Sequence, residues 1–171
     1  MGADWHVYLE YKKPGGKWEA HPNHVEYTDY DNMTRLEELP SLSGRNYILF
    51  GIVAGVRGGD TLFKARGLPG DVSEAVSSQF ADGYHTPTWL TPYEFERCFK
   101  RWIKEWNRYY GDGTYKLQGP APASGAWKES GISTAIFTWI RQELALEEAE
   151  KKLLGLRRGK TKYRFVIWFD S

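Results

Sequence analysis

The two ends of this chain carry its strongest strand patterns, and together they constrain the fold more than any other feature. Near the start, WHVYLEY (5–11) alternates, with Trp5, Val7 and Leu9 on one side. Near the end, YRFVIWF (163–169) becomes continuously apolar from residue 165. Alternation is typical of a strand, and a short apolar run is typical of a strand buried on both faces. We therefore predict that the two segments pair in one sheet.

Helices are predicted to pack against this sheet. The clearest begins at Thr91-Pro92, because Thr is a good N-cap and Pro loses nothing at the first helical position. Aromatic side chains then recur every three or four residues and form one stripe: Phe95, Phe99, Trp102, Trp106 and Tyr109. We assign this stripe to the core rather than to a stacking platform, because it occupies the face that a helix must bury.

Three further segments are predicted to be helical. The apolar segment 43–56 is long enough for a buried helix, although its β-branched residues favour a strand. Residues 71–80 are predicted to form a short helix capped by Asp71 or Ser73, and residues 130–154 a long one. We thus expect an α+β fold, in which a small antiparallel sheet pairs the N- and C-terminal strands and packs against three to four helices.

Length and composition indicate one domain in the cytosol. The 171 residues are enough for a single domain (1–171) with a full core, so the Pro/Ala/Gly-rich stretch 119–125 is expected to connect elements rather than domains. The formal net charge of +1 excludes a binder of extended nucleic acid, which needs a broad basic surface. The single cysteine, Cys98, suits a reducing compartment. No secretory signal and no membrane span are expected, because the longest apolar run, 47–56, is too short to cross a bilayer.

The stretch 55–91 is rich in Gly, Pro, Asp and Ser and is predicted to be a loop-rich middle that carries the functional site. It leads into the N-terminus of the helix that begins at residue 92, where free N–H groups favour phosphate or carboxylate. Arginine pairs bidentately with phosphate, and tryptophan stacks on a base. The candidate ligand-binding residues are Arg57, Arg66, His85, Thr86, Thr88 and Trp89. This set is typical of a site for a phosphorylated aromatic ligand.

Structural roles for the same residues stay open. Trp89 fits a core anchor, His85 fits a buried histidine bonded to the backbone, and Arg66 fits an ion pair with Asp71. No catalytic residue is assigned, because the sequence lacks a P-loop, a G-x-S-x-G elbow and other known enzyme motifs. If the protein is an enzyme, His85 is the candidate general acid or base, since its unperturbed pKa lies near neutrality.

No metal site and no cofactor are predicted. His21 and His24 lie close together within the polar stretch 20–40, which is predicted to be a surface excursion with a helical turn at 35–39. No cysteine or carboxylate cluster completes a metal-ligand set around them. Both histidines are therefore expected to be solvated loop residues.

The predicted helix 130–154 is solvated on most faces in its second half. Its spare surface leads us to expect a homo-oligomer. The basic segment 151–162 at the end of this helix fits either a surface that attracts anions or an ordinary charged helix terminus.

A resemblance is carried by the segments RNYILFGIVAGVR (45–57), RGLPGDVS (66–73), DGYHTPTWLT (82–91) and RFVIWFD (164–170). With them, the chain resembles a family of small phage-encoded proteins, mostly of unassigned function, over about residues 5–171. Thr86 and Thr88 stand where that family typically has serines. The resemblance implies a phage accessory protein that acts in the cytoplasm of the infected cell.

Small phage accessory proteins of this size include ones that sequester or degrade nucleotide immune signals. By analogy, the expected function is to bind and sequester such a signal, either a cyclic dinucleotide or an ADP-ribose derivative, as an anti-defence protein. Two alternatives stay open. One is a metal-independent phosphodiesterase that cleaves a cyclic nucleotide, with His85 as acid or base and His6 or Tyr84 as its partner. The other is an inhibitor that binds a host protein.

Overall fold

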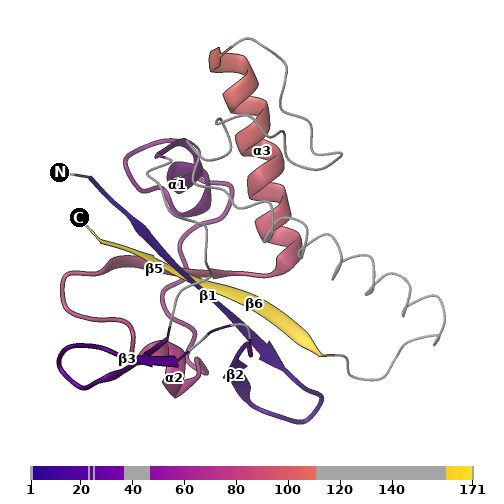
Figure 1. Cartoon of the computed structure of the whole chain (residues 1–171). Coiled ribbons are helices and arrows are strands. Elements are labelled where there is room, and N and C mark those ends of the chain that lie inside the picture. Colours follow the sequence, from indigo (N-terminus) through magenta and orange to yellow (C-terminus); the bar gives the residue numbers. More distant parts are fainter. Residues whose placement is uncertain (1, 23, 25, 37–46, 111–160, 171) are drawn as a thin grey trace, which may run out of the picture.

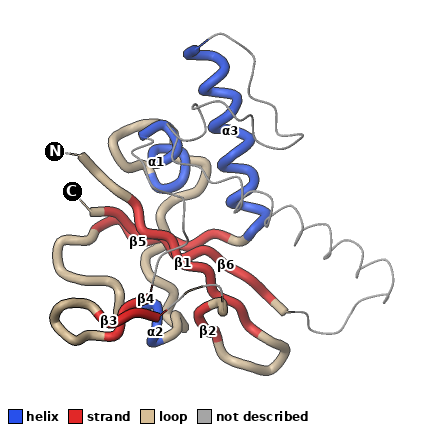
Figure 2. Tube along the Cα trace, in the orientation of Figure 1, coloured by secondary structure: helices blue, strands red, loops and turns tan. Residues whose placement is uncertain are grey.

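The computed structural model describes residues 2–22, 24, 26–36, 47–110 and 161–170. Figure 1 shows strands and helices mixed along the chain, and Figure 2 shows the same view coloured by element type. The elements in chain order are β1 (Trp5–Lys12), β2 (Trp18–Ala20), β3 (Glu26–Thr28), β4 (Thr34–Leu36), α1 (Tyr47–Ala54), α2 (Glu74–Ser77), β5 (His85–Leu90), α3 (Pro92–Tyr110) and β6 (Lys162–Phe169).

The main sheet has four strands in the order β2-β1-β6-β5, and all its neighbours are antiparallel. Strand β6 lies between β1 and β5, and it pairs with β1 over its full length, from Trp5 opposite Phe169 to Lys12 opposite Lys162. The predicted pairing of the chain ends and the α+β fold are therefore confirmed, with three helices among the described residues.

One face of the sheet packs against α1 and α3, which lie above the strands in Figure 1. The alternating residues of β1 that were predicted to share a face are all in this core, together with Phe165, Ile167 and Phe169 of β6. From α3, the described part of the aromatic stripe is fully buried: Phe95, Phe99 and Trp102. The stripe is therefore core, as predicted.

The opposite face is also covered, over part of its length. Tyr8, Val166 and Trp168 pack there against Leu36 of β4 and against apolar residues of the segment 68–84, which contains α2. Because β6 is central and covered on both faces, every residue from 165 to 169 is inaccessible to solvent. This burial explains the continuous apolar run in the sequence.

The prediction of a loop over 55–91 is wrong at its end, because His85–Leu90 forms β5. Proline removes a ladder donor and is tolerated only at an edge or a bulge. Pro87 has both conditions, since β5 is an edge strand with an irregularity between His85 and Thr88. Thr86 accordingly has a positive φ of 50°. The strand was not predicted because its sequence contains this proline.

Residues 20–36 also differ from expectation. They contain the two-stranded ribbon β3–β4, which includes Arg35, so the predicted helical turn is wrong there. His24 is buried rather than solvated, and its Nε2 accepts a hydrogen bond from the Leu9 N–H at 2.8 Å. The short helix α2 ends earlier than predicted, and Ser73 caps it by accepting from the Val76 N–H at 3.3 Å.

Several predictions fall outside the described residues. These are the start of the first helix at 43–46, the connector 119–125, the helix 130–154 with the homo-oligomer that it suggested, and most of the basic segment 151–162. In the described part of the chain, no helix combines the length and the hydropathy needed to cross a membrane.

Candidate functional site

An open pocket of about 420 Å³ lies on the face of the sheet opposite α1 and α3. We call it the tryptophan pocket. Its floor comes from the sheet and its wall from the segment 66–71. The lining residues are Lys12, Trp18, Arg66, Leu68, Pro69, Gly70, Asp71, Trp89, Lys162 and Arg164. The pocket thus combines two indole rings with four cationic side chains and one carboxylate.

Strand register brings these floor residues together. Lys12 of β1 lies opposite Trp18 of β2 on one side and opposite Lys162 of β6 on the other. Side chains directly opposite in a ladder share a face, so the three form one row across three strands. Arg164 lies two residues beyond Lys162 and therefore points to the same face. Trp89 of β5 lies opposite Val166, the next residue of that face.

Arg164 is buried and bound by two carboxylates. Its Nε donates to Glu10 Oε2 at 2.7 Å, and its Nη1 donates to Asp71 Oδ1 at 2.7 Å. The other oxygen of Glu10 accepts from the Ser73 N–H at 2.7 Å. A hydrogen bond from Arg164 lowers the pKa of the Asp71 carboxyl below its usual value. The arginine therefore ties the segment 71–73 to the floor of the pocket.

The two arginines also stack on the two tryptophans. The guanidinium carbon of Arg164 lies 3.9 Å from the centre of the Trp18 ring and 5.9 Å from that of Trp89. The guanidinium carbon of Arg66 lies 4.6 Å from the Trp89 ring. Cation–π contacts of this kind hold both planar groups against the rings. Arg164, which lies near both indole rings, therefore links the two stacks.

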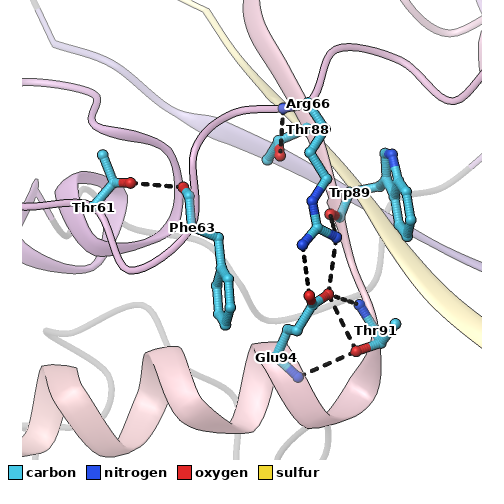
Figure 3. A network of polar contacts seen from close by, with 7 residues as sticks. All are labelled: Thr61, Phe63, Arg66, Thr88, Trp89, Thr91 and Glu94. Carbon is cyan, nitrogen blue, oxygen red and sulfur yellow. Dashed lines mark hydrogen bonds and ion pairs between the residues drawn. The ribbon is translucent and has the colours of Figure 1, made fainter.

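Arg66 is held by the start of α3, as Figure 3 shows. Its two terminal nitrogens bind the two oxygens of Glu94, one of them at 3.0 Å, and Nη1 also donates to the Trp89 carbonyl at 3.2 Å. Glu94 in turn accepts from the Thr91 N–H at 2.9 Å, while the Thr91 hydroxyl accepts from the Glu94 N–H. This is a capping box. The guanidinium is therefore committed to a carboxylate of its own chain.

The four cationic side chains of the pocket differ in whether a carboxylate binds them. Burial raises the pKa of Glu94, but its hydrogen bonds to Arg66 and Thr91 outweigh this and lower the pKa overall, so the carboxylate stays ionised beside Arg66. Within the described residues, neither Lys12 nor Lys162 forms an ion pair. Lys12 Nζ lies 6.0 Å from the centre of the Trp18 ring. Among the residues that the structure describes, these two lysines are therefore the cations of the pocket lining that no carboxylate holds.

The predicted site residues divide into two groups. Arg66 and Trp89 line the tryptophan pocket, and Thr88 lies fully buried behind it, where its Oγ1 accepts from the Arg66 N–H at 3.3 Å. Arg57 lies elsewhere, after α1, with its guanidinium 5.8 Å from the Tyr47 ring centre. His85 and Thr86 also lie outside the pocket lining and bind one another, with His85 Nδ1 2.9 Å from the Thr86 hydroxyl.

The sheet separates the residues named for an acid–base pair. The His85 ring stacks on Phe169, whose side chain belongs to the core under α1 and α3. His6 and Tyr84 contact each other with ring centres 4.6 Å apart, and both contact Trp168 on the opposite face. In the described part of the chain, no group of three or more His, Cys, Asp or Glu side chains is arranged to hold a metal ion.

Comparison of this chain with protein-family models, curated proteins and solved structures finds no match. The resemblance to small phage-encoded proteins thus stays a prediction.

Sequence reasoning missed Lys12, Trp18 and Arg164, whereas Lys162 was noted only as the end of a basic segment. The alternation of residues 5–12 does indicate which way Lys12 points, because Lys12 falls on the face of β1 opposite Trp5, Val7 and Leu9. What the sequence did not contain was the register, which places that lysine beside a strand 150 residues away.

Proposed function

We propose that this protein binds and sequesters a nucleotide-derived signalling molecule in the tryptophan pocket, as an anti-defence accessory protein of a phage. The observation that carries the proposal is that two tryptophans and four cationic side chains line one pocket. Base stacking on an aromatic ring contributes roughly 1–3 kcal/mol per base, and phosphate needs the cations. A ligand with both a base and a phosphate can contact the two tryptophans with its base and the cationic side chains with its phosphate.

The dimensions of the site favour a small molecule over an extended strand. A volume of about 420 Å³ lies in the range of roughly 300–1,000 Å³ that is usual for small-ligand pockets. The rigid walls also favour tight binding, because Arg66 and Arg164 are already fixed by carboxylates and lose little freedom when a ligand arrives.

Binding without cleavage is favoured by the chemistry of the lining. General acid–base catalysis needs a group that can exchange a proton near neutral pH. Of the pocket-lining residues, Asp71 is the only carboxylate, and its pKa is lowered by Arg164. His85, the candidate for a phosphodiesterase, contacts Phe169 on the other side of the sheet. We therefore place sequestration ahead of cleavage.

A specific observation also favours the second candidate, an inhibitor that binds a host protein. The ribbon β3–β4 carries three large apolar side chains that are at least half exposed: Tyr27, Tyr30 and Met33. Such side chains are common at protein interfaces.

The test is to incubate the purified protein with cyclic dinucleotides and ADP-ribose derivatives, remove it by filtration, denature it with heat and identify the released compounds by mass spectrometry. We expect one compound to be depleted and recovered unchanged. Trp18→Leu should abolish the depletion and Trp18→Phe should retain it, because only phenylalanine keeps a ring. Tyr47→Leu, an exposed aromatic outside the pocket, is the matched control.

Each other outcome has a definite meaning. A linear product in place of the recovered compound would support the phosphodiesterase. No depletion by the wild-type protein would overturn the proposal and leave the protein-binding inhibitor as the candidate.

A further inference from the structure

Lys12 and Lys162 are directly opposite one another in the β1–β6 ladder. Opposite side chains in an antiparallel pair have Cβ atoms about 4.5–5.5 Å apart, and like charges in this position destabilise the sheet. Both lysines line the tryptophan pocket. The strand register therefore places two positively charged residues side by side in the lining of one pocket, an arrangement that costs stability.

The arginines of the pocket do not share this situation. Arg66 binds Glu94, and Arg164 binds Glu10 and Asp71. An incoming anion would have to displace a carboxylate from either of them. No carboxylate in the described part of the chain forms an ion pair with Lys12 or Lys162, so an anion beside them meets two positive charges and relieves their repulsion. The position of an anionic group in the pocket is therefore set by the lysines rather than by the arginines.

We propose that Lys12 and Lys162 form a single clamp for a dianionic phosphate group, either a diphosphate or a phosphomonoester. This inference rests on the proposed function, because it assigns the phosphate end of a ligand whose base lies against Trp18 and Trp89. Trp18 lies opposite Lys12 in the ladder, so a ring stacked on this tryptophan lies directly beside the clamp.

The number of charges selects the class of nucleotide. Two ammonium groups carried by directly opposite residues match a group that carries two negative charges. The diphosphate of an ADP-ribose derivative has both charges on adjacent phosphates. A cyclic dinucleotide has two phosphodiesters, each with one charge, on opposite sides of a large ring, so only one of them can occupy the clamp. We therefore infer that the ligand belongs to the ADP-ribose class.

Isothermal titration calorimetry tests this with five probes: ADP-ribose, AMP, 3′,5′-cyclic AMP, cyclic di-AMP and adenosine. AMP, 3′,5′-cyclic AMP and adenosine share one nucleoside, so differences in affinity among these three report the phosphate. We expect ADP-ribose and AMP to bind at least tenfold more tightly than the singly charged cyclic AMP and the uncharged adenosine. Lys12→Gln and Lys162→Gln should each weaken ADP-ribose binding at least fivefold and leave adenosine binding unchanged.

Lys13→Gln is the matched control, because it removes the same charge from the next residue along the chain, which is exposed and outside the pocket lining. Its affinity for ADP-ribose should stay within twofold of the wild-type value. The comparison separates the clamp from a general effect of net charge.

Failure of the clamp and failure of the proposed function give different results. If the wild-type protein binds none of the five probes, the proposed function is overturned and the clamp with it. If it binds cyclic di-AMP more tightly than ADP-ribose, or if the clamp variants behave like Lys13→Gln, the clamp is overturned and the proposed function stands.

Discussion

Arg164 and Glu10 form an ion pair in which both side chains are almost completely buried, with Arg164 Nε donating to Glu10 Oε2 at 2.7 Å. Glu10 lies on β1 and Arg164 directly opposite it on β6. Arg164 also donates to the side chain and the carbonyl of Asp71, and the other oxygen of Glu10 accepts from the Ser73 N–H. A buried charge pair needs such further hydrogen bonds, because water is excluded from both ions. The pair therefore joins the sheet and the pocket wall.

Replacing Arg164 with methionine should strongly destabilise the protein. The substitution leaves the Glu10 carboxylate buried without a cation, which costs about 3–5 kcal/mol in comparable cases. Urea denaturation measures the free energy of unfolding. Asp71→Asn is the control, since Asp71 is mostly exposed and should cost less than about 1 kcal/mol. A loss for Arg164→Met as small as that of the control would contradict this account.

Replacing Glu94 with glutamine should remove a stability contribution that depends on pH. Hydrogen bonds to Arg66 and Thr91 lower the pKa of Glu94 in the folded state below its unfolded value of 4.5. Its ionised form therefore stabilises the wild type above pH 4.5, by about 1 kcal/mol for a partly exposed pair and cap. This contribution is lost as the pH falls through the lowered folded pKa.

Urea denaturation at a series of pH values from 7 downward measures this effect. The difference between wild type and Glu94→Gln should be constant from pH 7 to about 5 and shrink below the unfolded pKa of 4.5. A difference that stays constant to the lowest pH with a folded baseline would show that the charge of Glu94 is unimportant.

Much of the fold was predictable, because its signals are local. The alternation of 5–11 and the apolar run of 165–169 each indicate a strand, and Thr91-Pro92 marks the start of α3 by itself. Strand β5 was not predictable in this way. Its sequence, HTPTWL, contains a proline that is tolerated only because the strand lies at the edge of the sheet, and an edge position is a property of the whole fold.

The site was predictable only in part, for the same reason. Arg66 and Trp89 lie within one polar stretch, so proximity in the sequence was enough to associate them. Lys12 and Lys162 are joined by strand register, which a single sequence does not reveal. Proximity in the sequence also associated Arg57 and His85 with Arg66, and neither of them lines the tryptophan pocket.

Gly51→Ala should destabilise the protein by about 1–3 kcal/mol, the usual cost of overpacking a buried site. Gly51 lies in α1, and a Cβ there would collide with the carbonyl oxygen of Gly58. Gly70→Ala is the control, because a Cβ at Gly70 meets no atom within 4 Å. Thermal unfolding compares the two. Equal midpoints for both variants would mean that the chain after α1 adjusts without cost.

Cys98 should not react with thiol reagents while the protein is folded. The side chain is fully buried, and burial raises the pKa of the thiol to about 12, so the reactive thiolate is scarce at neutral pH. Reaction with a chromogenic disulfide should be rapid in urea and should occur in buffer only at the rate at which the site opens. Fast labelling of the folded protein would contradict the packing described for α3.

Lys162→Gln should stabilise the ligand-free protein at low ionic strength. The substitution removes the repulsion with Lys12, which for directly opposed like charges amounts to about 0.2–1 kcal/mol. Near 1 M NaCl the gain should vanish, because the Debye length falls to about 3 Å. Urea denaturation at both salt concentrations measures it, with Lys13→Gln as the reference. A gain that is independent of salt would point to a cause other than charge.

The position of β6 between β1 and β5 has a consequence for the order in which the protein acquires structure. A growing chain that has reached the end of α3 already holds β1, β2 and β5, yet it lacks the strand with which β1 and β5 both pair. Until residues 162–169 are made, the apolar faces of β1 and β5 cannot be joined in one sheet, and the helices have no complete sheet to pack against. Contacts between such distant segments form slowly. Until then, the exposed surface of the nascent chain is a natural target for chaperones.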